Sequence, residues 1–320
     1  MQLQPIHLSS GNLIADRRFE WARDCEAKGD LAAAADLLVQ ALELAPDYAP
    51  AWFVLGELRE KLGNRAGAID AFAQAKAADP QDRHGAALHL VRLGAEPAVA
   101  MPESYVRTLF DGYAAGFDRA LTEGLSYRAP ELLFRAVAAA QTGPRMKFGS
   151  VLDLGCGTGL AALPFRPLSD WLVGVDLSPA MVAQAESKQL YDRLATGELA
   201  AFLKGELDKG ERYDLVVAAD VFVYVNDLAP VLAAATKTLA PGGVFAFTVE
   251  THPGEGVKLL QTLRYAHGEP YIRRALAGAG LSTASIAKAA VRSEKGVPVD
   301  SLVVIAVAST LPNVPVTFSG

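Results

Sequence analysis

Two acidic residues and three glycines in the middle of the chain have the spacing of a nucleoside-binding site. One apolar run carries Asp153 and ends in alternating glycines, Gly155, Gly157 and Gly159. A second apolar run follows and ends at Asp176. Glycines after one strand let the backbone approach a ligand closely, and an acid at the end of the next strand accepts hydrogen bonds from both ribose hydroxyls. The pattern is typical of an α/β sheet that holds an adenine nucleoside.

The spacing Asp-x-Gly-x-Gly-x-Gly resembles the cofactor loop of class I methyltransferases and differs from the Gly-x-Gly-x-x-Gly turn of dinucleotide-binding folds. The resemblance implies S-adenosyl-L-methionine as the cofactor and S-adenosyl-L-homocysteine as the product. It places the glycines under the methionine part of the cofactor, Asp153 opposite the ammonium group and Asp176 at the ribose. The alternatives are an ordinary strand-to-helix turn for the glycines and a helix N-cap for Asp176.

Five more residues are candidates for the same cofactor site. Leu177 and Met181 would flank the adenine, although lone apolar residues serve equally well in a core. Glu198 follows the third expected strand and would receive the adenine amino group, or would simply lie at a helix N-terminus. Asp220 follows the fourth expected strand, where cofactor and substrate would meet. Tyr113 precedes the first strand, where related enzymes use an aromatic residue to close over the cofactor; core packing is its alternative.

His267 is the candidate catalytic residue. It belongs to an Arg-Tyr-Ala-His stretch before an expected helix, where class I methyltransferases commonly carry substrate-facing residues. An imidazole of near-neutral pKa can act as a general base. The competing interpretation is a histidine that bonds locally near the helix start. Tyr113 and Phe117, four residues apart in an expected helix at 104–118, are predicted to share one helix face.

From residue 148 onward, apolar runs alternate with helical runs, which predicts a parallel sheet. Two further strands, Ser282–Val291 and Ser301–Ala308, would form a terminal antiparallel hairpin. Such a hairpin is the ending of the methyltransferase sheet, whereas a nicotinamide-binding fold would continue with parallel units. The resemblance thus implies an α/β fold with a Rossmann-like class I methyltransferase sheet. The five parallel strands are expected at 150–154, 171–175, 191–195, 213–218 and 243–249.

The first third of the chain repeats itself at an interval of 34 residues, with Gly29 and Pro46 recurring as Gly63 and Pro80. The period and its small and large residues resemble the tetratricopeptide repeat, which implies an all-α module of antiparallel helix pairs. Because such arrays usually need about three units for stability, we expect this module to pack against the catalytic domain or a second copy of the chain.

Taken together, the segments resemble a bacterial-type family of class I methyltransferases fused to tetratricopeptide repeats. Stretches at 110–118, 264–267 and 292–294 carry the resemblance beyond the generic fold. The predicted organisation is a tetratricopeptide-repeat helical module at 1–100, a helical lid or linker at 101–147, the methyltransferase domain at 148–310 and a tail at 311–320.

Composition narrows the class of protein. Half of the 320 residues are hydrophobic and the net charge is −6, which predicts a globular protein and argues against a nucleic-acid partner. No apolar run approaches the roughly 18 residues of a membrane helix, and no signal peptide is apparent at the N-terminus. Cys25 and Cys156, expected in different domains, predict reduced thiols in a cytoplasmic protein, and no cysteine–histidine pattern predicts a metal site.

The function implied by the family is methyl transfer to a small-molecule acceptor by in-line displacement. The repeats would bind a protein partner or mediate self-association. A protein methyltransferase whose repeats hold the target, and a non-catalytic binding or scaffold protein, stay open as alternatives, as do the less favoured dehydrogenase and nucleic-acid methyltransferase.

Overall fold

The computed structural model describes residues 9–141 and 147–308, and the chain forms two compact units. The first unit runs up to Gly112 and includes Leu259–Leu263; the second comprises Tyr113–Lys258 and the chain from Arg264 onward. The boundary therefore falls inside the lid or linker region predicted at 101–147. The predicted tail at 311–320 lies outside the described residues. Within the described ranges, no helix is long and apolar enough to cross a membrane.

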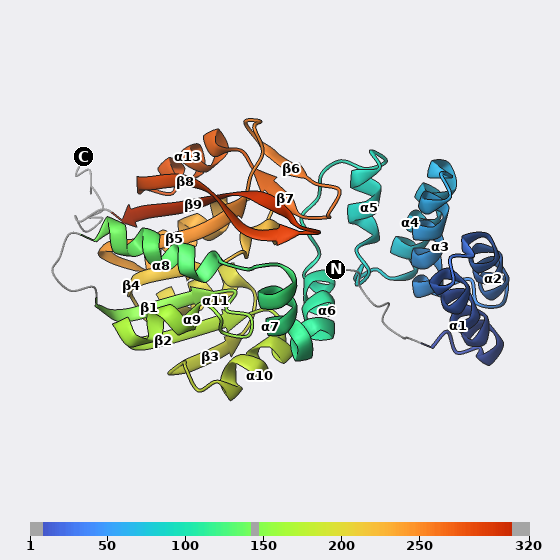
Figure 1. Ribbon diagram of the computed structural model, residues 1–320, viewed down its shortest axis with the longest axis horizontal. Coiled ribbons are helices and arrows are strands. Elements are labelled where there is room, and N and C mark those ends of the chain that lie inside the picture. Colours follow the sequence, from blue (N-terminus) through green and yellow to red (C-terminus); the bar gives the residue numbers. More distant parts are fainter. Residues whose placement is uncertain (1–8, 142–146, 309–320) are drawn as a thin grey trace, which may run out of the picture. The chain divides into compact units, whose positions relative to one another are not determined.

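The first unit is helical, as the repeats predict. Side-chain N-caps start three of its helices, because Asn12, Asp30 and Asn64 each accept a hydrogen bond from a backbone N–H of the first turn. A Cβ at Gly56 would lie 2.7 Å from the Phe72 ring, so the repeat glycine lets two helices pack closely. The helices are α1 (Leu13–Ala27), α2 (Leu31–Leu44), α3 (Ala49–Lys61), α4 (Arg65–Ala78), α5 (Ala86–Arg92) and α6 (Glu103–Tyr113) (Figure 1).

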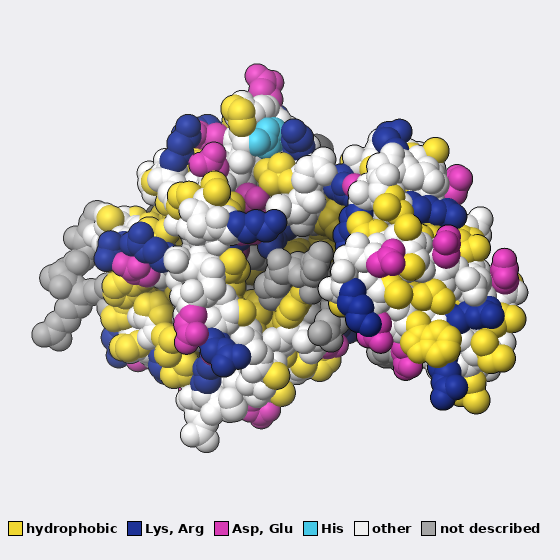
Figure 2. All heavy atoms as spheres, turned by 45° about the vertical axis from the view of Figure 1, so that its right-hand side comes forward, with side chains coloured by type: hydrophobic (Ala, Val, Ile, Leu, Met, Phe, Trp, Pro, Cys, Tyr) yellow, Lys and Arg dark blue, Asp and Glu magenta, His cyan; other side chains and the backbone are white. Residues whose placement is uncertain are grey.

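Three large apolar side chains of α1 are exposed. Leu13 is 84% exposed, Ile14 60% and Trp21 54%. Figure 2 shows hydrophobic side chains on the face of the helical unit turned toward the viewer.

The second unit contains the predicted sheet. Strands β1 (Phe148–Leu154), β2 (Ser169–Asp176), β3 (Arg193–Thr196), β4 (Tyr213–Ala218) and β5 (Leu239–Glu250) run parallel in the order β3-β2-β1-β4-β5. Strand β9 (Val297–Ala308) pairs antiparallel with β5, and β8 (Leu281–Glu294) pairs antiparallel with β9. The parallel sheet with its terminal hairpin is therefore confirmed. Two short strands, β6 (Val257–Leu259) and β7 (Tyr265–His267), were not predicted.

Apolar side chains of successive strand residues pack on opposite faces of the sheet. On β1, Val151 contributes to one core cluster and Leu152 to the other. Helices α8 (Ala129–Ala140) and α9 (Ala162–Phe165) cover the face of Val151, and α11 (Leu199–Asp208), α12 (Ala229–Thr238) and α13 (Glu269–Gly278) cover the other (Figure 1). Both faces are buried, so the carboxyl ends of the parallel strands provide the functional edge.

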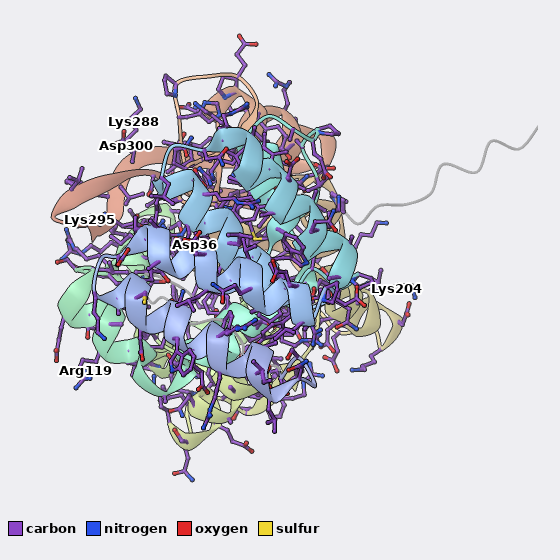
Figure 3. All side chains as sticks on the ribbon, turned by 90° about the vertical axis from the view of Figure 1, so that its right-hand side faces the viewer. Asp36, Arg119, Lys204, Lys288, Lys295 and Asp300 are labelled. Atoms are coloured by element: carbon purple, nitrogen blue, oxygen red, sulfur yellow. The ribbon has the colours of Figure 1, made fainter. Side chains whose placement is uncertain are left out.

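Lysines mark the surface of this unit. Lys204 on α11 and Lys288 on β8 point outward into solvent (Figure 3). They provide neutral positions for control substitutions.

Candidate cofactor site and adjacent polar cluster

The loop after β1 has the backbone that its three glycines predict. Gly155, Gly157 and Gly159 have φ values of +67°, +53° and +89°, in the left-handed region that favours glycine. A Cβ at Gly155 would also lie 2.5 Å from a methyl carbon of Val221. The loop therefore needs glycine at this position for both conformation and space.

Asp176 at the end of β2 is joined directly to this loop. One carboxylate oxygen accepts the N–H of Gly157 at 2.9 Å, and the other accepts the N–H of Ser178 at 2.9 Å. The N-cap of α10 (Pro179–Ser187) is Ser178, whose hydroxyl accepts the N–H of Met181. The N-cap alternative for Asp176 is therefore wrong, and the acid lies beside the glycines as a ribose-binding residue must.

Asp153 lies near the carboxyl end of β1 with 1% of its surface exposed. Its Oδ2 atom accepts the hydroxyl hydrogen of Tyr191 at 2.7 Å, whereas its Oδ1 atom is buried without a hydrogen-bond partner among the described residues. Burial raises the pKa of Asp153 to about 7; the hydrogen bond from Tyr191 lowers it and the charge of Asp176 raises it further. A buried acceptor without a donor is costly, and a cationic ligand group would satisfy it.

The residues of this site fit S-adenosylmethionine. The left-handed loop provides close backbone approach, Asp176 stands beside it, and the unpartnered oxygen of Asp153 matches an ammonium group. Tyr191, which orients Asp153, was missed in the sequence because it precedes the short strand β3 and has no local motif.

The helix predicted at 104–118 is broken. After α6, the chain forms a 3₁₀ turn (Ala114–Gly116), the short helix α7 (Phe117–Arg119) and a π-helical turn (Ala120–Gly124). The prediction that Tyr113 and Phe117 share one helix face is therefore wrong. Phe117 still lies near the loop, because a Cβ at Gly157 would be 3.9 Å from its ring.

A polar latch holds this segment to the cofactor loop. Asp118 accepts hydrogen bonds from the hydroxyl of Thr158, within the glycine loop, and from Lys188 Nζ at 2.6 Å. Further along, the N–H of Arg128 donates to the carbonyl of Val291. The segment from 113 to 128 thus spans from the glycine loop to β8.

The adenine candidates have different surroundings. Glu198 is the N-cap of α11 and accepts the N–H groups of Ala200 and Ala201 at 2.8 and 2.7 Å, as the helix-terminus alternative predicts. The side chain of Met181 is fully buried, as its core alternative predicts, and its place beside the adenine stays a prediction. Leu177 is half-buried directly after Asp176 and stays a candidate.

Asp220 is bound by a cation that the sequence analysis did not place. Both of its carboxylate oxygens accept hydrogen bonds from Arg292, at 2.5 and 2.6 Å, and its N–H donates to Thr248 Oγ1 at 2.8 Å. Its φ of +59° is unusual for a residue other than glycine. Its carboxylate pairs with Arg292, and its role as a cofactor ligand stays a prediction.

Arg292 is the centre of a buried polar cluster at the carboxyl ends of β4 and β5. It is 2% exposed and also donates to Glu250 at 2.6 Å and to Glu294 at 3.2 Å, while Arg264 pairs with Glu294. The surrounding carboxylates raise the pKa of Arg292 against the opposing effect of burial. The sequence indicated only the two acids of this cluster, since Asp220 follows β4 and Glu250 ends β5; the cation they share comes from β8.

His267 lies buried and is hydrogen-bonded to a nearby loop. Its side chain is fully buried, and Nε2 lies 2.9 Å from the carbonyl oxygen of Val225, which can only accept, so Nε2 carries the hydrogen. Burial lowers the pKa of His267 to about 4. Its ring lies 5.6 Å from that of Tyr271. The bond to Val225 agrees with the alternative of a locally bonded histidine, and the general-base role stays a prediction.

Comparisons with known proteins agree with this geometry. A family model described as a methyltransferase domain matches residues 152–245, and a tetratricopeptide-repeat model matches residues 27–90. The chain is 34% identical over 94 residues to a ubiquinone biosynthesis O-methyltransferase of Bradyrhizobium sp. (strain ORS 278), which covers 29% of this chain and 37% of that protein. The chain thus spans little more than a third of the length of this relative.

A second relative, the protein of the same name from Methylobacterium nodulans, is 27% identical over 96 residues, which cover 30% of this chain and 39% of that protein. The fold is similar to that of the Burkholderia thailandensis 1,6-didemethyltoxoflavin-N1-methyltransferase, with a TM-score of 0.51 and 19% identity over 67% of this chain and 93% of that one. Separate segments of the chain therefore match a methyltransferase domain, at residues 152–245, and a tetratricopeptide repeat, at residues 27–90.

Proposed function

We propose that this protein transfers a methyl group from S-adenosyl-L-methionine to a small-molecule acceptor. One observation carries the proposal: Asp176 accepts the backbone N–H of Gly157, while Asp153 keeps a buried oxygen that has no partner among the residues described. The two carboxylates lie at the ends of neighbouring strands, with the glycine loop between them. This arrangement suits the ammonium group and the ribose hydroxyls of the cofactor.

The residues would divide the binding task. Asp153 would take the ammonium group, Asp176 the ribose hydroxyls, and the glycine loop the methionine part. Leu177 would flank the adenine, and Glu198 would accept from the adenine amino group in addition to capping α11. Tyr113 would close over the site. When bound, the cofactor supplies an activated methyl group on its sulfonium.

The protein's contribution to the transfer is positioning and exclusion of water. The segment from 113 to 128, latched through Asp118, would cover the cofactor. The Arg292 cluster would form a rigid wall on the acceptor side, because Arg292 holds Asp220 and Glu250 together at the ends of two strands. The relatives named as O-methyltransferases of ubiquinone biosynthesis support a small-molecule acceptor.

We propose an interaction role for the repeats, through a protein partner or a second copy of the chain. The exposed Leu13, Ile14 and Trp21 on α1 support it, because apolar side chains gathered on a surface commonly mark contact sites. If the repeats instead present a protein to the active site, the acceptor would be that protein.

Labelled methyl transfer distinguishes these acceptors. The purified protein would be incubated with S-adenosylmethionine labelled in its methyl group, together with either the low-mass fraction or the protein fraction of a bacterial extract. We expect label in low-mass products, and none with the Asp176→Ala variant. Label in polypeptides would favour the protein-methyltransferase alternative, and no transfer to either fraction would favour a scaffold.

A further inference from the structure

Tyr191 makes a hydrogen bond to Asp153 that has no role in the proposed mechanism. It lies between α10 and β3, and its hydroxyl donates to Asp153 Oδ2 at 2.7 Å. This bond joins residues 38 positions apart and reaches the innermost carboxylate of the cofactor site. Burial and the neighbouring charge of Asp153 raise the pKa of Tyr191 well above its usual value, so the hydroxyl stays protonated and remains a donor.

The space for the Tyr191 ring comes from two glycines on different elements. A Cβ at Gly174, in the middle of β2, would lie 2.7 Å from Tyr191 Cε1, and a Cβ at Gly159 would lie 3.0 Å from Cε2. The φ of Gly159 requires glycine in any case, but Gly174 is in a regular strand. The close approach of the Tyr191 ring therefore explains why position 174 carries a glycine.

We propose that Tyr191 is a positioning residue that holds Asp153 with one oxygen occupied and the other presented to the cationic amino group of the cofactor. The inference rests on the proposed function. Strand β1 fixes the backbone of Asp153, the Tyr191 hydroxyl fixes the rotation of its carboxylate, and the two glycines fix the ring. The unpartnered Oδ1 atom is what this arrangement leaves for the ligand.

The titratable groups around Asp153 determine how the affinity of the cofactor site depends on pH. Asp176 is the neighbouring acid, Cys156 lies in the same loop, and Tyr127 comes from the covering segment. Burial and Asp176 raise the pKa of Asp153, and Tyr191 is the hydrogen-bond donor that lowers it. Without the hydroxyl, Asp153 would become protonated at higher pH and would lose its attraction for a cation.

Calorimetric titration with S-adenosylhomocysteine at pH 6 and pH 8 tests the assignment. The variant is Tyr191→Phe and the matched control is Tyr213→Phe, which removes another buried hydroxyl that donates to a carboxylate, that of Glu206. We expect Tyr191→Phe to weaken binding by about twofold at pH 8 and about tenfold at pH 6, corresponding to a rise of about one unit in the pKa of Asp153. The control should match the wild type at both pH values.

A second measurement does not need the ligand. Carbon-13 NMR of the Asp153 carboxyl group should give a higher pKa in Tyr191→Phe than in the wild type. If the wild type fails to bind S-adenosylhomocysteine but the pKa still rises, the proposed function fails while the Tyr191–Asp153 coupling stands. An unchanged pKa, or a loss of affinity equal at both pH values, would overturn the positioning role.

Gly174→Ala provides an independent variant if Tyr191→Phe does not fold. Its new methyl group would displace the ring while leaving the hydroxyl intact. We expect the same pH-dependent loss of affinity and the same rise in the pKa of Asp153. Wild-type behaviour of Gly174→Ala would contradict the inference, because the ring could then move without effect on the carboxylate.

Discussion

Arg292 on β8 donates to both carboxylate oxygens of Asp220, the residue that follows β4 with a φ of +59°. The ion pair therefore holds a residue of unfavourable backbone conformation at the edge of the sheet where the acceptor would bind. Strain of this kind persists only where the surrounding structure maintains it, and it concentrates at functional sites. The pair connects the terminal hairpin, which defines the fold, to the proposed active site.

Replacing Arg292 with Gln should destabilise the protein strongly. The change leaves Asp220 and Glu250 buried without their cation, and breaking a buried ion pair costs about 3–5 kcal/mol. Urea unfolding would measure the loss, with Lys288→Gln on the same strand as the exposed control. If both variants unfolded at the same urea concentration, the cluster would not be a stabilising element.

Gly155→Ala should abolish cofactor binding and reduce stability. The new Cβ would meet Val221 at 2.5 Å, and the residue would keep a left-handed conformation. Gly210→Ala is the matched control, since Gly210 has a φ of +80° and a Cβ added there would meet nothing within 4 Å. The control should lose only about 1 kcal/mol. Equal thermal stability of the two variants would exclude the predicted clash.

The stability of the protein should fall as pH drops from about 6.5 to about 4 because of His267. Its pKa is lowered from 6.5 to about 4 in the folded protein, so the unfolded chain takes up a proton in this range and the folded one does not. The contribution of His267 to the free energy of unfolding is fully present above pH 6.5. Its loss by about pH 4 amounts to about 3 kcal/mol.

Unfolding measured from pH 7 to pH 4 in the wild type and His267→Gln would show this effect as a steeper decline in the wild type. His252→Gln, which changes a half-buried histidine nearby in the sequence, is the control. Parallel pH profiles for the wild type and His267→Gln would show that His267 is accessible to protons and would support its role as a base.

Asp118→Asn should loosen the segment that covers the glycine loop. The variant loses its ion pair with Lys188 and weakens the bond from Thr158, each worth about 1 kcal/mol or less. We expect amide hydrogen exchange over residues 114–128 to accelerate several-fold, with little change in the sheet. Glu123→Gln, in the same segment and exposed, should leave exchange unchanged. Equal exchange in Asp118→Asn and the wild type would mean that Asp118 is no latch.

The sheet could be predicted because each strand carries its own local signal. The apolar runs of β1, β2 and β4 lie between glycine turns and helical segments, and the terminal hairpin is marked by Gly296. The glycine loop and Asp176 were predicted together because the turn and the following acid form one local motif. The structure adds a hydrogen bond from the N–H of Gly157 to Asp176, and the role of Asp176 at the ribose stays a prediction.

What could not be predicted depends on contacts between distant parts of the chain. Tyr191 and Arg292 become functional candidates only when β3 and β8 place them beside Asp153 and Asp220. The burial of His267 is likewise a tertiary effect, since a lone histidine carries no local sign of its surroundings. Glycines at 112 and 116 were a signal that the helix expected at 104–118 would break, but the aromatic pattern outweighed them.

The proposed cofactor site requires that the protein bind S-adenosylhomocysteine. Calorimetry would compare the wild type with Asp176→Ala and with Lys204→Ala as a surface control, and NAD would serve as the competing ligand. We expect micromolar binding to the wild type and the control, at least tenfold weaker binding to Asp176→Ala because a charged hydrogen-bond acceptor is lost, and no binding of NAD. A wild-type protein that did not bind S-adenosylhomocysteine, or that bound NAD more tightly, would contradict the proposed site.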